Sequence, residues 1–285
     1  MSRLDVGGRN VNVREHGDGP AVILLHSASS HSGQWKWLVE RLGDAFHVLA
    51  PDLHGYGGSG PFPDDDQPYF RHDGMIVTTL LDNVDGPVHL VGHSLGGTIA
   101  LRSALEHADR LASVTLIEPV LFNLLEEIED PTAQEHLLLA RTMRALVRNG
   151  EREGAARVFV EAWGAPGGFD AMDARTRAYV MRTIDRATGD WSAMSRRAPG
   201  ALTATDLGAL AAPTLLLCGQ NTRPSMHRIA ALLRAAIPAI EYQEIAGAGH
   251  MSPVTHHASV NEVIVAFLRR QAHCYGKPAP TVRPT

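Results

Sequence analysis

The sequence has few cysteines, few aromatic residues and no long apolar run. Only Cys218 and Cys274 are cysteines, among 285 residues. Two distant cysteines give neither a disulfide framework nor the spacing of a metal site, so we expect a reducing, cytoplasmic setting. The longest apolar runs, such as 21–25 and 215–218, fall far short of the roughly 18 residues that a membrane span requires. The residues after Met1 include no apolar stretch of signal-peptide length either.

Neither sign of charge dominates the sequence. Lys and Arg number 26, Asp and Glu 31, and the formal net charge is -5. The densest basic cluster, Arg196-Arg197, is too short to neutralise a run of phosphates. We therefore expect no nucleic-acid partner and no membrane partner, while the oligomeric state stays open.

Short apolar runs alternate with helical patterns at both ends of the chain. This alternation predicts the α/β class, with a mostly parallel central sheet flanked by helices. The predicted strands are 11–15, 21–26, 47–51, 88–92, 113–118, 214–219 and 241–245, and the predicted helices of this core are 34–42, 74–83, 95–106, 225–236 and 259–271.

The stretch 121–205 interrupts the alternation, because it contains helical patterns, such as 133–147 and 154–162, and no convincing strand. We predict a core made of residues 1–120 and 206–274, with 121–205 inserted as a helical lid. Residues 275–285 contain three prolines and little apolar surface, so we expect a disordered tail there.

The pentapeptide Gly92-His93-Ser94-Leu95-Gly96 follows an apolar strand pattern and opens a helical one. Gly-x-Ser-x-Gly between a strand and a helix is typical of a nucleophile elbow, where a tight turn exposes the serine hydroxyl. The glycines are needed because bulk at either position would collide with neighbouring backbone. The sequence therefore predicts Ser94 as a nucleophile, against the alternative that the pattern arises by chance among 27 glycines.

Four motifs in order resemble the α/β-hydrolase superfamily. They are Leu24-Leu25-His26, Pro51-Asp52-Leu53-His54-Gly55-Tyr56-Gly57-Gly58-Ser59, Gly92-His93-Ser94-Leu95-Gly96-Gly97 and Gly247-Ala248-Gly249-His250-Met251-Ser252-Pro253. The resemblance spans nearly the whole chain apart from the lid and the tail. It implies the fold but no substrate, since the superfamily includes many kinds of hydrolase. A serine at the elbow sets the chain apart from the family's dehalogenases and epoxide hydrolases, which use Asp.

Among the 15 histidines, we predict His250 as the base because of its place in the chain. It lies in a glycine-rich loop after the last predicted strand, and such loops cross the carboxyl edge of the sheet where the elbow also lies. His26 and His93 are better explained as structural residues.

The acid departs from the commonest family pattern, which places Asp at the position of Thr222. Glu118 ends the predicted strand after the elbow helix. In this it resembles some α/β-hydrolases, including relatives of the zearalenone lactone hydrolases, which place their acid at this strand end, sometimes as Glu. We predict Glu118 as the acid on the chain order Ser, acid, His, with Asp206 as the reserve.

The resemblance also implies an oxyanion hole made of the backbone N–H groups of Leu95 and Ala28. Ser27 replaces the usual glycine in that loop. Candidate pocket residues are Ser27, Met251 and, in the predicted lid, Phe159, Trp163, Phe169, Trp191 and Met194. For any one of the lid residues a place in the core is the commoner role.

These residues predict a serine hydrolase that cleaves a small or medium carboxylic ester or lactone through an acyl-enzyme. No dinucleotide fingerprint, phosphate loop or metal-spaced cluster is evident, so we expect neither a metal nor an organic cofactor. Two alternatives stay open: a C–C bond hydrolase of dienoate-like ring-fission products, and a small-molecule binding protein on the same fold.

Overall fold

The computed structural model describes residues 2–63, 65, 67, 69–164, 167–190, 194 and 200–275. In this part of the chain, eight strands form one sheet in the order β1-β2-β4-β3-β5-β6-β7-β8. The strands are β1 (Ser2–Val6), β2 (Arg9–His16), β3 (Ala21–Leu25), β4 (His47–Pro51), β5 (Val88–His93), β6 (Leu111–Ile117), β7 (Thr214–Gly219) and β8 (Ile240–Ile245). β2 pairs antiparallel with β1 and β4, and all other pairs are parallel.

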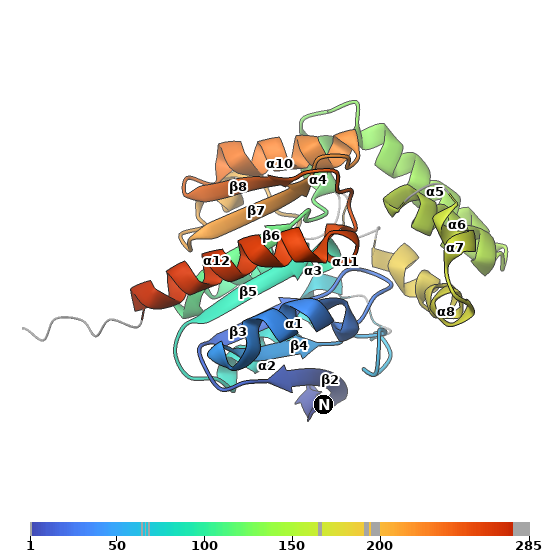
Figure 1. The fold of residues 1–285 in the computed structure, drawn as a ribbon. Helices are drawn as coiled ribbons and strands as arrows, with labels where there is room; N and C mark the ends of the chain where they lie inside the picture. Colours follow the sequence, from blue (N-terminus) through green and yellow to red (C-terminus); the bar gives the residue numbers. More distant parts are fainter. Residues whose placement is uncertain are drawn as a thin grey trace, which may run out of the picture.

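Helices cover both faces of the sheet, which confirms the predicted fold class (Figure 1). The central strands are buried throughout, and successive side chains reach opposite faces: Leu90 joins one apolar cluster and Val91 the other. The first cluster includes residues of α2 (Tyr69–Asp82), α3 (Leu95–Glu106) and α10 (Pro224–Ala236). The second includes residues of α1 (Lys36–Leu42) and α12 (His257–Tyr275).

Strand β1 was absent from the predicted elements. Only Val6 of its five residues is buried, so the strand carries almost no apolar pattern. The signal that marks it is the turn Gly7-Gly8, where both residues have positive φ, as a two-residue hairpin between β1 and β2 requires. At the other end α12 continues to Tyr275, the first residue of the predicted tail, and 276–285 lie outside the described residues.

Between β6 and β7 the described residues form helices and no strand. They are α4 (Phe122–Glu127), α5 (Ala133–Arg148), α6 (Arg152–Trp163), α7 (Gly168–Ala171), α8 (Ala174–Asp190) and α9 (Ala204–Gly208). α5 to α8 lie together beyond one end of the strands, on the side where α11 lies (Figure 1).

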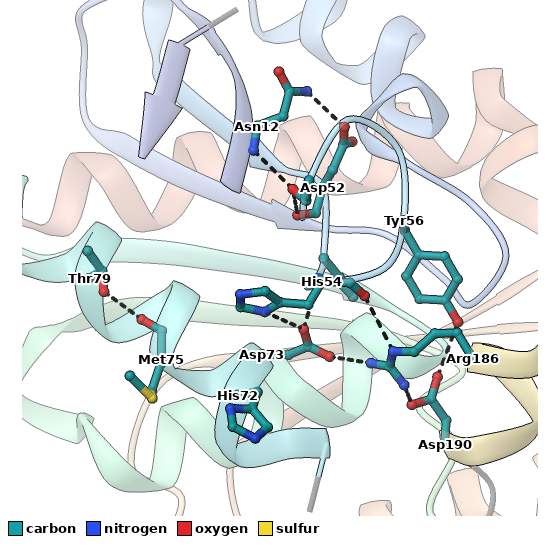
Figure 2. Close-up of polar contacts among 12 residues, drawn as sticks. Asn12, Asp52, His54, Tyr56, His72, Asp73, Met75, Thr79, Arg186 and Asp190 are labelled. Atoms are coloured by element: carbon teal, nitrogen blue, oxygen red, sulfur yellow. Dashed lines mark hydrogen bonds and ion pairs between the residues drawn. The ribbon is translucent and has the colours of Figure 1, made fainter. Parts of the chain in front are cut away.

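A buried ion-pair network attaches the end of α8 to the core (Figure 2). Arg186 of α8 pairs with Asp73 of α2 at 2.7 Å and with Asp190 one turn further on. Asp73 also accepts a hydrogen bond from the backbone N–H of His54, at 3.2 Å, and Tyr56 donates its hydroxyl to Asp190. Both carboxylates are buried, so the guanidinium of Arg186 compensates charges that water does not reach.

Two hydroxyl groups attach α8 to the loops that follow β3 and β4. Tyr179 donates to the carbonyl of Ser30 at 2.6 Å and accepts from the backbone N–H of Gly57. Thr183 donates to Ser29 at 3.1 Å. α8 therefore contacts the core along several turns.

We expect Arg186→Met to lower the free energy of unfolding by about 3–5 kcal/mol, because it leaves Asp73 and Asp190 as buried carboxylates without their guanidinium partner. Urea unfolding at neutral pH measures the change. Arg175→Met, at an exposed position of the same helix, is the control and should change stability by less than about 0.5 kcal/mol. Equal losses in the two variants would contradict a stabilising role for the network.

Candidate active site

Ser94 lies in a turn whose backbone is strained. It joins β5 to α3 with φ 55° and ψ -116°, in a region that residues with a side chain rarely adopt. A Cβ on Gly92 would lie 2.2 Å from the carbonyl oxygen of Gly96, and one on Gly96 would lie 2.2 Å from that of Leu25. Both positions therefore need glycine. The N-terminus of α3 follows Ser94 directly, where the helix dipole favours negative charge.

His250 reaches Ser94 from the loop between β8 and α11 (Ser252–Thr255). Its Nε2 lies 2.9 Å from the hydroxyl oxygen of Ser94, and both residues are buried. The backbone carbonyl of His250 accepts a hydrogen bond from Nε2 of His93, at 2.9 Å. Burial, and next the neighbouring His250, hold the pKa of His93 well below its usual value, so His93 stays a neutral donor.

Glu118 completes the hydrogen-bonded chain. It follows β6 directly with φ 42°, and its Oε2 lies 2.7 Å from Nδ1 of His250. The backbone N–H of Gly219 donates to Oε1 at 2.7 Å, and Thr222 donates its hydroxyl to Oε2 at 2.6 Å. Burial raises the pKa of Glu118, but the hydrogen bonds from His250, Thr222 and Gly219 outweigh it and the net pKa lies below the usual value.

These contacts define the proton positions. An ionised Glu118 accepts from Nδ1–H of His250, which leaves Nε2 as the acceptor for the hydroxyl of Ser94. This is the arrangement that a serine nucleophile and its general base require.

Asp206, the reserve acid, lies elsewhere. Its carboxylate accepts from the backbone N–H and the hydroxyl of Thr203, at 2.7 and 2.8 Å, and so caps the exposed N-terminus of α9. The hydrogen bond to Nδ1 of His250 is made by Glu118.

Leu95 and Ala28 both line the cavity at Ser94. Leu95 is the first residue of α3, and Ala28 lies in the loop after β3. In that loop the hydroxyl of Ser27, the residue that replaces glycine, donates to the side chain of Gln34 at 2.9 Å. Nδ1 of His26 donates to the carbonyl of Ser27, at 2.7 Å, and burial lowers the pKa of His26 to about 4. A neutral His26 therefore holds the loop.

The cavity above Ser94 has a volume of about 350 Å³ and mostly apolar walls. Ser27, Phe159, Trp163 and Met251 line it as predicted, while Trp191 lies outside the described residues. The Trp163 ring packs against the His250 ring, with 4.4 Å between their centres. Met194 lines the cavity as well, whereas Phe169 is buried and absent from the lining. Wall residues that sequence reasoning missed include Val120, Val160, Met172, Thr176, Val180 and Val254.

Three of the missed residues follow a helical spacing in the sequence. Met172, Thr176 and Val180 are four residues apart, which places Thr176 and Val180 on one face of α8. The spacing alone does not say whether such a face meets the core or a cavity.

Within the described part of the chain, no three His, Cys, Asp or Glu side chains gather in a way that could hold a metal ion. No described helix is both long and apolar enough to cross a membrane.

Comparison with known families identifies the family of this chain. Residues 22–263 match the model of the alpha/beta hydrolase family, so the chain belongs to this family.

Two curated relatives show how broad the family is. A fluoroacetate dehalogenase from Burkholderia is 31% identical over 131 residues, 44% of this chain and only 43% of that protein. A pimeloyl-[acyl-carrier protein] methyl ester esterase from Nitrosomonas europaea is 25% identical over 74% of this chain and 81% of that protein. Because family members cleave different bonds, membership alone does not identify the bond.

The crystal structure of a hydrolase from Pseudomonas aeruginosa has a TM-score of 0.77 to this chain. It is 23% identical and the match covers 94% of this chain and 97% of the other. At this identity the likeness shows the fold.

We expect Gly96→Ala to lower the free energy of unfolding by about 3 kcal/mol or more, because the new methyl group would collide with the backbone of Leu25. Gly74→Ala in α2 is the matched control: a Cβ there meets nothing within 4 Å, and we expect up to about 1 kcal/mol of stabilisation. Chemical denaturation measures both, and a neutral Gly96→Ala would show that the turn has room for a side chain.

Proposed function

We propose that this protein cleaves a small or medium carboxylic ester or lactone through an acyl-enzyme on Ser94. One observation carries the proposal: Glu118, His250 and Ser94 form a continuous, buried chain of hydrogen bonds at an apolar cavity. Side chains that only stabilise the fold have no need of a strained serine at the end of such a chain.

In the proposed reaction, Nε2 of His250 takes the proton of Ser94 as its oxygen attacks the substrate carbonyl. The carbonyl oxygen becomes an oxyanion, which accepts hydrogen bonds from the backbone N–H groups of Leu95 and Ala28. Collapse of this intermediate expels the alcohol, which leaves with the proton from His250. Water then attacks the acyl-enzyme by the same steps and releases the acid.

The carboxylate of Glu118 stabilises His250 while the imidazole carries the extra proton. Because Glu118 is hydrogen-bonded to Nδ1, it also keeps Nε2 free for proton transfer. No metal or organic cofactor is needed for these steps.

The cavity walls favour a substrate with an apolar portion. Among the residues that line it, Val120, Val180 and Met194 are buried, whereas Thr176 and Val254 are exposed. A volume of about 350 Å³ is at the small end of ligand pockets. We propose that the helices of residues 121–205 act as a lid over this cavity, since α6 and α8 supply much of its wall.

Two other functions compete with ester cleavage. A C–C bond hydrolase of dienoate-like products could use the same serine and histidine. A binding protein would need neither, and the short Ser94 to His250 contact weighs against it. The esterase from Nitrosomonas europaea favours ester cleavage over both.

We expect a fluorophosphonate probe to label the protein covalently at Ser94, because the probe reacts with an activated serine hydroxyl. Labelling should disappear in Ser94→Ala and persist in Ser103→Ala, a buried serine of the same α3 helix. Mass spectrometry of the labelled peptide is the measurement. A folded parent protein that remains unlabelled would support the binding function.

A panel of neutral p-nitrophenyl esters, lactones and a ring-fission dienoate distinguishes the two enzymatic functions. We expect hydrolysis of the esters or lactones. Turnover of the dienoate alone would overturn the proposed bond specificity.

Glu118→Gln should lower kcat by about 10⁴, because the amide lacks the charge that stabilises protonated His250. Asp206→Asn, the matched control, should keep kcat within a few fold because Asp206 caps α9 away from the cavity. Steady-state kinetics on the best ester decides: parent-like turnover by Glu118→Gln would exclude it as the acid.

A further inference from the structure

We propose that Thr222 is a positioning residue, whose hydroxyl fixes the orientation of the Glu118 carboxylate and so the acceptor that His250 needs. The inference rests on the proposed serine-hydrolase function and deepens it. It concerns a residue that stands where the superfamily most often carries the acid itself.

The geometry around Oε2 of Glu118 carries the proposal. This oxygen accepts from the Thr222 hydroxyl at 2.6 Å and faces Nδ1 of His250 at 2.7 Å. The other oxygen accepts from the backbone of Gly219 at 2.7 Å. The carboxylate is fully buried, so these donors compensate its charge in place of bulk water.

The Thr222 hydroxyl is held in place by its loop. The turn closes with a hydrogen bond from the backbone N–H of Thr222 to the carbonyl of Gly219, at 3.2 Å. The neighbouring Asn221 donates its backbone N–H to Ala248, at 2.7 Å, two residues before His250. The loop that carries Thr222 is thus bound both to Glu118 and to the loop of the base.

The residue after Thr222 contacts the helices that form part of the cavity wall. Arg223 donates to the carbonyl of Ala162 at 2.8 Å and pairs with Glu135 of α5. Ala162 precedes Trp163, whose ring packs on His250. One short loop therefore contacts the acid, the loop of the base and the helix that covers the base.

Removing the hydroxyl has a defined direction of effect. With one donor fewer, more negative charge stays on Oε2, and the coupled Glu118–His250 pair binds its proton more tightly. The direction is the same whichever of the two groups takes the proton, because the measured value belongs to the pair. The protonated pair cannot activate Ser94, so the acid limb of the activity profile moves to higher pH.

The test uses Thr222→Val, which keeps the shape and removes the hydroxyl, and Thr222→Ser, which keeps the hydroxyl. The measurement is kcat/KM for p-nitrophenyl butyrate against pH. We expect Thr222→Val to raise the midpoint of the acid limb by about one pH unit, from the strength of a hydrogen bond to a charged group. KM should change little, and Thr222→Ser should follow the parent profile.

Thr222→Ala repeats the test without added bulk if the valine variant fails to fold. An acid limb at the parent position in the variant that lacks the hydroxyl overturns the proposal. A shift that Thr222→Ser shares also overturns it, because the loop rather than the hydroxyl would then be responsible.

Failure of the proposed function would look different. A parent protein with neither ester hydrolysis nor labelling of Ser94 would contradict the serine-hydrolase function. An active, labelled parent with an unshifted valine variant would contradict the role of Thr222 alone.

Discussion

The hydrogen bond between Glu118 and His250 joins residues 132 positions apart, and the organisation of the site depends on it. It fixes which imidazole nitrogen carries the proton and hence which nitrogen faces Ser94. The groups that form and support it lie at the ends of different strands: Glu118 follows β6, Gly219 ends β7 and His250 lies in the loop after β8. The carboxyl ends of neighbouring parallel strands lie side by side, so they bring such residues together although long stretches of chain separate them. The strained backbones of Ser94 and Glu118 are held by this surrounding structure.

Much of this organisation could be predicted from the sequence. Strands such as β3 and β7 are short, wholly buried apolar runs, and a fixed succession of strands and helices defines the sheet. β1 could not be predicted in the same way, because an edge strand with one buried residue has almost no apolar pattern. Ser94 and His250 were recognisable because tight glycine turns constrain the sequence around them.

The candidate acid and the cavity walls are harder to predict from the sequence, for a physical reason. Glu118 and Asp206 both stand between Ser94 and His250 in the chain, and only coordinates show that one reaches His250 while the other caps α9. The cavity walls come from helices that have a core-facing side as well, so spacing identifies a face and not its neighbour. Thr222 shows the same limit: its place in the sequence marks a missing carboxylate, whereas its contact with Glu118 depends on three dimensions.

The hydrogen-bonded chain lies entirely on the core, whereas α6 and α8 contribute cavity walls and no member of that chain. The proposed catalytic residues and the cavity walls from α6 and α8 therefore belong to different parts of the fold. A segment that replaced the helices between β6 and β7 would have to reproduce their contacts with the core, among them the carbonyl of Ala162 that Arg223 binds and the ion pair of Arg186 with Asp73. Both contacts lie outside the cavity lining, so a change of wall residues on α6 and α8 leaves them in place.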